Sequence, residues 1–408
     1  MSEFHISEDE KRTHVDETSP EPKKEEEHII IKKWDELDLN PDILRGVYAY
    51  GFETPSPIQC KAILPIMQGR DIVAQAQSGT GKTATFTIGA LSRIDLESKT
   101  TQVLVMSPTR ELSMQSRSVF SSLGQMMNGL KTQLLVGGSS VEKDMKMLTE
   151  NTPHVAIGCA GRIQDMIRRG GLVTSTIKLL IVDEADEMLD FGFKDQLQGI
   201  VQTLPTTSQI ALFSATLPKF ALDVVDKIMR NPVHIIVKKE QLTLEGIQQY
   251  YVAMEDDMQK YAVLKDLYTK LNVSQCIIYC NSIERVQELA QAMINDGFPI
   301  CCIHSNMDKK QREKAITDFR KGTHRILISS NVTARGIDVQ QVGVVLNFDI
   351  CKNTHTYLHR IGRSGRWGRK GVGINFVTRR DISKLRNIES YYHTQIDELP
   401  MNFMEHIM

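Results

Sequence analysis

The sequence predicts an α/β protein with two tandem domains, each a doubly wound parallel sheet. The 408 residues exceed what one ordinary hydrophobic core accommodates, so two domains are expected. From Trp34 onward, short β-branched apolar runs alternate with longer amphipathic stretches. This alternation is typical of βα units, whose parallel strands are buried on both faces and therefore continuously apolar. The same alternation restarts after residue 246, which indicates a second sheet.

The expected strands fall into two groups, one for each sheet. The first group comprises residues 71–74, 103–106, 179–182 and 210–213, and the second comprises residues 276–279, 325–328 and 344–347. Residues 238–245 are charged and follow neither a strand nor a helix pattern, so we interpret them as the interdomain linker. The predicted domains are therefore residues 34–237 and 246–408.

Charge is distributed unevenly along the chain. Residues 1–33 hold ten Asp/Glu and six Lys/Arg, a balance of −4, whereas the whole chain carries −1 and the remainder +3. This segment has too few large apolar side chains to form a core, so we expect a disordered acidic tail. Residues 352–386 hold ten Lys/Arg and one acid, Asp381. Such a run is either a solvated face or a surface for an anionic partner.

The composition argues against several classes of protein. A hydrophobic fraction of 41% and a charged fraction of 24% are ordinary for a globular protein. No apolar run approaches the ~20 residues that span a bilayer, and the acidic start does not resemble a signal peptide. The seven cysteines lack disulfide-framework or metal-site spacing, which favours reduced thiols. We therefore expect a soluble protein of the cytoplasm or nucleus.

Residues 76–83, Ala-Gln-Ser-Gly-Thr-Gly-Lys-Thr, are predicted to form a phosphate-binding loop between a strand and a helix. Glycines let backbone N–H groups surround phosphate oxygens at a helix N-terminus. Lys82 can reach the β- and γ-phosphates, and the Thr83 hydroxyl can ligate Mg²⁺. The first position is alanine, so the strict pattern is not met. The nucleotide-binding residues expected here are Ser78, Gly79, Thr80, Gly81, Lys82 and Thr83.

An acidic segment follows the expected strand 179–182, with the sequence Asp183-Glu184-Ala185-Asp186. A carboxylate at the end of a strand beside a phosphate loop can hold Mg²⁺, and we assign this role to Asp183. Glu184 can orient and deprotonate the attacking water. Acidic residues after a strand are often only an exposed loop, but their order after Lys82 and Thr83 favours a catalytic pair.

The second domain offers positive charge for the transition state. In residues 359–366, His-Arg-Ile-Gly-Arg-Ser-Gly-Arg, we expect Arg363 and Arg366 on one helical face at i, i+3. Arginines supplied by a second body make hydrolysis depend on closure of the two domains. A basic helix facing RNA or solvent is the alternative. Upstream, Asp338 can accept hydrogen bonds from a ribose hydroxyl.

These motifs, in this order, resemble those of DEAD-box RNA helicases, and the likeness runs from about Trp34 to the C-terminus. It is greatest to the initiation factor 4A group, and the segment 394–402 resembles that group's nuclear third paralogue. Residues 51–59 look like the adenine-reading Q motif of the family. The resemblance implies two RecA-like domains that use ATP and Mg²⁺ and bind RNA largely independently of its sequence. It is also compatible with a protein partner, either a scaffold or a protein linked to translation initiation or splicing.

The resemblance assigns further roles one residue at a time. Phe52 would stack on adenine and Gln59 would hydrogen-bond its edges. Four residues would couple hydrolysis to RNA binding, namely Asp186, Ser214, Thr216 and His359. The RNA-backbone positions would be Pro108, Thr109, Arg110, Gly138 and Arg162 in the first domain and Asn281 and Ser330 in the second.

Four departures from the family pattern mark the chain as diverged. The usual Thr-Pro-Gly-Arg is Cys159-Ala160-Gly161-Arg162, and Asn331 stands where the family has aspartate. Lys309 replaces a glutamine three residues before Arg312, and Ser113 replaces an alanine. The ATP-contacting positions match, whereas three of the four changes lie in RNA-binding motifs. Hydrolysis is therefore the firmer expectation, and efficient unwinding the weaker one.

Three hypotheses remain open from the sequence. The first is an ATP-dependent RNA helicase that bends and locally unwinds RNA in translation initiation or RNA processing. The second is an ATP-gated RNA clamp within a ribonucleoprotein scaffold, which would use the same residues. The third is a DNA translocase, which the Q motif and the Asp-Glu-Ala-Asp segment disfavour because both resemble RNA enzymes.

Overall fold

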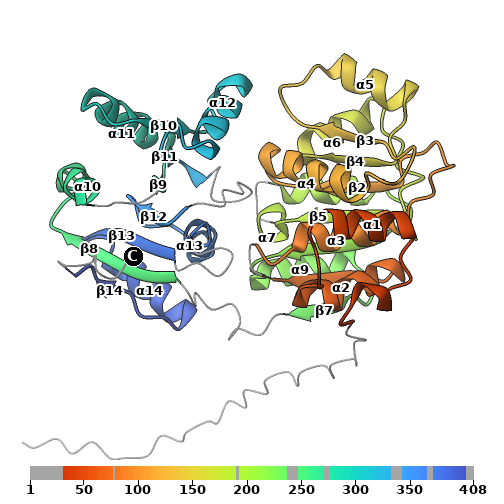
Figure 1. Ribbon diagram of the computed structural model, residues 1–408, viewed down its shortest axis with the longest axis horizontal. Helices are drawn as coiled ribbons and strands as arrows, with labels where there is room; N and C mark the ends of the chain where they lie inside the picture. The colour runs from red at the N-terminus through yellow and green to blue at the C-terminus, as the bar shows by residue number, and fades with distance from the viewer. Residues whose placement is uncertain are drawn as a thin grey trace, which may run out of the picture.

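The computed structural model of the chain describes residues 31–76, 79–189, 193–236, 247–270, 275–331, 342–364 and 371–400. These residues form two lobes, each a seven-stranded sheet accompanied by helices (Figure 1). The strand pairings of both sheets are parallel. The predicted fold class is confirmed. Across the described ranges, no helix combines the length and apolar character needed to cross a membrane.

The first lobe contains a sheet with the strand order β3-β4-β2-β5-β6-β1-β7. Its strands are β1 Ile72–Gln75, β2 Val103–Met106, β3 Thr132–Leu135, β4 Val155–Gly158, β5 Leu179–Asp183, β6 Gln209–Ser214 and β7 Val233–Ile236. A short 3₁₀ helix, η1 Trp34–Glu36, precedes its α-helices, which are α1 Pro41–Ala49, α2 Pro57–Met67, α3 Lys82–Leu91, α4 Arg110–Leu123, α5 Val141–Glu150, α6 Ala160–Arg168, α7 Ala185–Met188, α8 Lys194–Val201 and α9 Lys219–Ile228.

The second lobe repeats this plan, with the strand order β10-β11-β9-β12-β13-β8-β14. Its strands are β8 Ile247–Met254, β9 Cys276–Tyr279, β10 Ile300–Ile303, β11 Ile326–Ser329, β12 Val344–Asn347, β13 Gly371–Thr378 and β14 Asp397–Glu398. Its helices are α10 Gln259–Lys270, α11 Ile283–Asn295, α12 Lys309–Arg320, α13 Thr354–Ile361 and α14 Ile382–Tyr392.

The inner strands of each sheet are buried on both faces, which explains why they lack polar alternation. On β5, Leu179 and Ile181 belong to one buried cluster, whereas Leu180 and Val182 belong to the cluster on the opposite face. Successive side chains of a strand point to opposite faces, so a strand covered on both sides is apolar throughout. The polar groups for a site are consequently placed at the carboxyl ends of the strands, where β5 ends at Asp183.

The two sheets are separated along the chain by residues 237–246, which the structure does not describe. β7 ends at Ile236 and β8 begins at Ile247, and the expected linker 238–245 lies outside the described residues. Residues 1–30 of the expected tail lie outside them as well. Ile31, assigned to that tail, is 2% exposed, and its backbone N–H donates to Cys60 O at 3.2 Å. The packing of the first lobe therefore includes Ile31.

Candidate active site between the lobes

The phosphate loop approaches α3 through two glycines in the left-handed region. Gly79 has a φ of 87°, and Gly81, the residue before α3, has a φ of 98°. A Cβ at Gly81 would also lie 2.9 Å from Gln59 Nε2, so a larger residue would be both strained and in steric conflict. This turn starts α3 at Lys82, whose side chain is buried at 6% exposure. Ser78, also expected in the loop, lies outside the described residues.

The Q motif packs directly against this loop. Gln59 is 2% exposed, and its Oε1 accepts a hydrogen bond from Ser56 N at 2.7 Å in a capping box at the start of α2. Ser56 Oγ donates to Thr80 O at 2.8 Å, which ties the capping box to the phosphate loop. The sequence reasoning did not single out Ser56, although a Ser-x-x-Gln spacing before an apolar helix is the signal of a capping box.

Phe52 is half-buried in an aromatic cluster near the start of α2. Its ring centroid lies 4.9 Å from that of Tyr50 and 6.5 Å from that of Trp34. Trp34 Nε1 donates to Phe52 O at 3.1 Å, which ties the residue before α1 to the start of the Q motif. The cluster leaves part of the surface of Phe52 accessible.

Lys82 and the two carboxylates meet where β5 ends. Lys82 Nζ donates to Ala76 O at 3.0 Å and lies 4.0 Å from Glu184 Oε1. Asp183 and Glu184 are each 3% exposed. Burial, together with the neighbouring Glu184 carboxylate, raises the pKa of Asp183 to about 7. Glu184 itself has a φ of 51°, a left-handed backbone that is strained for a residue other than glycine and typical of functional sites.

We call the region where Lys82, Thr83, Asp183 and Glu184 lie at the end of β5 the corner. Its chemistry suits a hard divalent cation. Asp183 offers a buried carboxylate whose charged form is disfavoured by its surroundings, which a cation would reverse. Thr83 adds a hydroxyl in the first turn of α3, a helix that packs on β5. Oxygen donors of this kind are those that Mg²⁺ prefers. Asp183 and Thr83, the two residues predicted as metal ligands, therefore offer donors that suit Mg²⁺. The phosphates of a bound nucleotide would add further oxygen donors.

A buried network joins this corner to the second lobe. Asp186 Oδ2 accepts from Thr216 Oγ1 at 2.7 Å and lies 3.1 Å from His359 Nε2. Ser214 Oγ accepts from the backbone N–H groups of Asp186 and Thr216, each at 3.3 Å. The side-chain ligand atoms of Glu184, Asp186 and His359 lie within 4.8 Å of one another. The structure thus brings all four predicted coupling residues together beside Glu184.

The arginines of the second lobe require one correction. Arg363 was expected on a helical face, but α13 ends at Ile361, and Arg363 lies in the turn that follows. The turn is closed by 3₁₀-type bonds from Arg363 N to Arg360 O and from Ser364 N to Ile361 O. Arg363 is 3% exposed, and its Nε donates to His359 O at 3.2 Å. Arg366 and Asp338 lie outside the described residues.

Arg360 is a buried residue that the sequence reasoning passed over. It is 0% exposed, although it belongs to the basic run 352–386. Its guanidinium donates to the side-chain oxygens of Asn281, Asn331 and Asn347 at 2.7 to 3.1 Å. In its described part, the basic run therefore contains the buried Arg360 and Arg363 as well as exposed residues, namely Lys352, Arg379, Arg380 and Arg386.

The expected RNA-backbone residues of the first lobe lie around the start of α4. Thr109 is the N-cap of α4, and its hydroxyl accepts from Leu112 N at 3.3 Å. Pro108 before it is buried, and Arg110 Nη1 donates to Gly137 O at 3.1 Å beside Gly138. Arg162 is instead held within the lobe, because it contacts the Asp144 carboxylate and donates to Ser139 Oγ at 2.9 Å.

The expected RNA-backbone residues of the second lobe are Asn281 and Ser330. Asn281 Nδ2 donates to Ile350 O at 2.8 Å, while its Oδ1 accepts from Arg360. Ser330 follows β11, and its backbone N–H donates to Ile303 O at 3.3 Å. Both residues are therefore anchored by contacts of their own lobe.

Two departures from the family pattern touch each other. Ser113 Oγ lies 3.7 Å from Cys159 Sγ and also donates to Thr109 O at 3.1 Å. Cys159 is the N-cap of α6 and makes no side-chain capping bond. Cys159 lacks the hydroxyl of the threonine that the family pattern has at this position. The nearby Ser113 does not supply a surface hydroxyl in its place, because it is completely buried.

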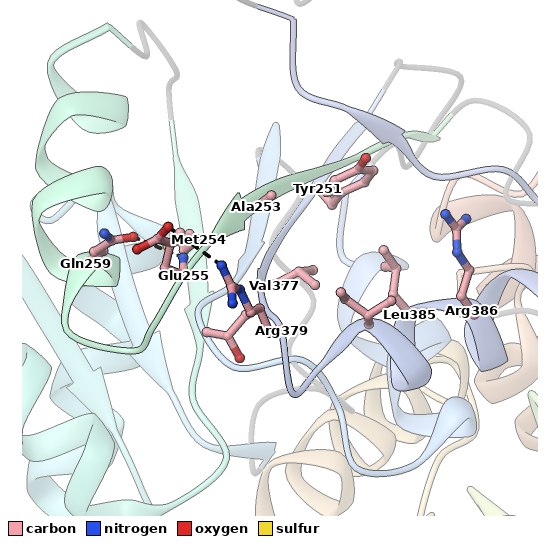
Figure 2. A pocket seen from close by; sticks show the side chains of 11 residues that line it. Tyr251, Ala253, Met254, Glu255, Gln259, Val377, Arg379, Leu385 and Arg386 are labelled. Carbon is pink, nitrogen blue, oxygen red and sulfur yellow. Dashed lines mark hydrogen bonds and ion pairs between the residues drawn. The ribbon is translucent and has the colours of Figure 1, made fainter.

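A separate pocket of about 430 Å³ lies in the second lobe, beside the ends of β8 and β13 and against α14 (Figure 2). Its apolar wall includes Ala253, Val377 and Leu385. Glu255 and Arg379 face each other in Figure 2, and their ion pair has a separation of 3.8 Å. None of the predicted site residues lines this pocket, so it is distinct from the interlobe site.

Comparisons with known proteins agree with this geometry. The family of DEAD/DEAH box helicases matches residues 56–224, and the helicase conserved C-terminal domain matches residues 259–368. Eukaryotic initiation factor 4A of Caenorhabditis elegans is 49% identical over 91% of this chain and 92% of its own length. The ATP-dependent RNA helicase fal1 of Schizosaccharomyces pombe is 50% identical over 91% of this chain and 94% of its own.

A solved structure shows the same arrangement of two lobes. Dbp5 of S. cerevisiae bound to RNA and ADP BeF3 is 33% identical, with a TM-score of 0.85 over 92% of this chain and 98% of that one. Three observations indicate the same family. They are the residues that gather between the lobes, the two matched domain models, and the relatives that align over 92% and 94% of their own lengths. The chain belongs to the DEAD/DEAH box helicase family.

Proposed function

We propose that this chain hydrolyses ATP between its two lobes in order to bind, bend and locally unwind RNA, as an ATP-dependent RNA helicase of the initiation factor 4A type. The observation that carries the proposal is the Asp186 network. It links Thr216 of the first lobe to His359 of the second within 3.1 Å of one carboxylate oxygen, next to Glu184. A shared buried carboxylate makes the arrangement of the catalytic corner depend on how the lobes meet.

Each residue of the corner has a role that its surroundings support. Lys82 would hold the β- and γ-phosphates from the first turn of α3, where backbone N–H groups also favour anions. Glu184 would accept a proton from the water whose oxygen attacks the γ-phosphorus as the bond to the β-phosphate breaks. Mg²⁺, held through Asp183 and Thr83, would neutralise charge on the phosphate oxygens. Phe52 and Gln59 would select adenine.

The second lobe would complete the charge balance. Arg363, with Arg366, would face the charge that develops in the transition state once the lobes are closed. In the structure, Arg363 is fixed to His359 O at 3.2 Å, so its position follows that of the Asp186 network. This connection supports the coupling of arginine placement to lobe closure.

RNA would bind across both lobes through its phosphates and sugars rather than its bases. Arg110 and Gly138 in the first lobe, with Asn281 and Ser330 in the second, are the positions we assign to it. The 2′-hydroxyl would distinguish RNA from DNA. A nuclear or cytoplasmic location, and a scaffold or initiation partner, are consistent with the relatives but are not needed for this mechanism.

The proposal is tested by measuring RNA-stimulated ATPase activity and strand separation with the same preparation. An RNA-stimulated ATPase that separates short duplexes supports the helicase. Stimulation by RNA without strand separation, together with phosphate release that a bound protein slows, supports the clamp instead. Arg110 and Glu111 of α4 form ion pairs with Glu313 and Arg312 of α12, contacts that a closed clamp would also use, so the clamp is the second candidate.

A further inference from the structure

Two reciprocal ion pairs connect the lobes away from the nucleotide corner. α4 begins with Arg110 and Glu111 in the first lobe, and α12 carries Arg312 and Glu313 in the second. Arg110 Nη2 lies 3.3 Å from Glu313 Oε1, and Arg312 Nη2 lies 2.7 Å from Glu111 Oε1. The same Arg-Glu order occurs on both helices, so each cation meets an anion of the opposite lobe.

Arg110 is held on a second side by its own lobe. Its Nη1 donates to Gly137 O at 3.1 Å. Gly138 has a φ of 78°, and a Cβ there would lie 3.4 Å from Arg110 Nη1, in van der Waals contact with it. The guanidinium therefore lies against Gly137 and against Gly138, which we assign to the RNA backbone. With 12% of its side chain exposed, its orientation is set by these neighbours rather than by solvent.

The position of Arg110 favours an anion close to its guanidinium. It is the first residue of α4, where the positive end of the helix dipole disfavours a cation. Among the described residues, the carboxylate in ion-pair contact with Arg110 comes from Glu313, which belongs to the other lobe. Without closure, Arg110 loses this carboxylate and remains at a position that is unfavourable for a cation.

We propose that Glu313 is a positioning residue of the RNA site, which orders the Arg110 guanidinium against Gly137 and Gly138 when the lobes close. The inference rests on the proposed function, because it takes Arg110 to be a contact for an RNA phosphate. Glu313 touches neither RNA nor nucleotide in this account. It makes the phosphate contact of one lobe depend on the presence of the other, so that RNA affinity rises on closure.

The test measures the affinity of the full chain for fluorescent single-stranded RNA over a series of salt concentrations, with and without a non-hydrolysable ATP analogue. The variants are Glu313→Gln, Arg110→Gln and the double substitution. Glu313 is 43% exposed, so its replacement by an isosteric amide should not disturb folding. With the analogue, we expect each single variant to bind RNA about tenfold more weakly, the loss of one charged hydrogen bond.

The salt dependence identifies what is lost. Each phosphate contact contributes about 0.7 to the slope of log affinity against log salt for a single strand. Glu313→Gln and Arg110→Gln should each lower the slope by about that amount. The double variant should lower it no further, because the two residues act on one contact. Without nucleotide, Glu313→Gln should match the wild type.

Arg312→Gln is the matched control, because it removes the neighbouring interlobe ion pair and leaves Arg110 and Glu313 in place. It should weaken RNA binding with the analogue while preserving the salt slope. A normal slope in Glu313→Gln, beside a reduced slope in Arg110→Gln, would overturn the positioning role and leave the RNA site intact. Tighter RNA binding by Glu313→Gln would also overturn it, since Glu313 would then compete with phosphate. No effect of Arg110→Gln would remove the premise that Arg110 contacts RNA.

Discussion

Replacing His359 by alanine should weaken closure of the lobes while leaving nucleotide binding to the first lobe intact. His359 Nε2 lies 3.1 Å from Asp186 Oδ2, and the two residues are 1% and 4% exposed. A hydrogen bond to a charged group contributes ~1.5–3 kcal/mol. At ~1.4 kcal/mol for each factor of ten, the closure equilibrium should fall by about 10- to 150-fold. Thr216 still donates to Asp186 at 2.7 Å, so the lower half of this range is expected.

The assay separates closure from nucleotide binding. Steady-state ATPase rates are measured over a titration of single-stranded RNA, and nucleotide affinity is measured without RNA by fluorescence of a labelled analogue. RNA-stimulated turnover should fall by the factor given above, because Glu184 and the second-lobe arginines act together only when closed. RNA-independent nucleotide affinity should remain within twofold of the wild type, ~0.4 kcal/mol.

His359→Gln is the control for packing. Its amide nitrogen can reach the place of Nε2, so it should retain part of the contact and lose less activity than alanine. Equal loss in both variants, or normal RNA-stimulated turnover in His359→Ala, would refute a closure role for the Asp186–His359 contact. A large loss of nucleotide affinity without RNA would show instead that the substitution damages the first lobe.

Three further predictions concern the corner and the diverged RNA segment. Lys82→Ala should abolish ATP binding or turnover, because Lys82 is the buried cation beside the phosphate loop; normal affinity and turnover in this variant would exclude the loop assignment. Glu184→Gln should retain ATP and RNA but not hydrolyse, so that RNA remains bound in ATP; release as fast as in the wild type would argue against Glu184 as the base. The double change Cys159→Thr and Ala160→Pro should tighten RNA binding by at most ~1.5–3 kcal/mol in a direct titration. It should also stabilise α6, since threonine suits its N-cap and proline its first position; unchanged RNA affinity would mean that position 159 does not contact RNA.

Features set by local sequence were predictable. The apolar strands, the phosphate loop and the acidic pair after β5 depend on residues adjacent in the chain. The turn before Lys82, for example, requires a residue in the left-handed conformation, and the glycine at position 81 indicates this in the sequence. The order of these motifs along the chain then identified the family.

Features that depend on contacts between distant residues were not predictable from the residues alone. Arg360 looks like part of a basic surface, yet it is buried among three asparagines from separate segments of the second lobe. The pairing of Arg110 with Glu313 spans 203 positions and depends on how the lobes meet. α13 ends at Ile361, before Gly362, and glycine disfavours helix continuation, so Arg363 does not lie on the expected helical face.

ATP hydrolysis by the full chain, measured with increasing single-stranded RNA and with DNA of the same sequence, tests the central claim most directly. In the proposed mechanism, Arg363 and Arg366 join Lys82 and Glu184 only when the lobes close on RNA. The rate should therefore rise to saturation with RNA, remain near its basal value with DNA, and lose its RNA response in Arg366→Ala. A full rate in the absence of RNA, or from residues 34–237 alone, would contradict the account.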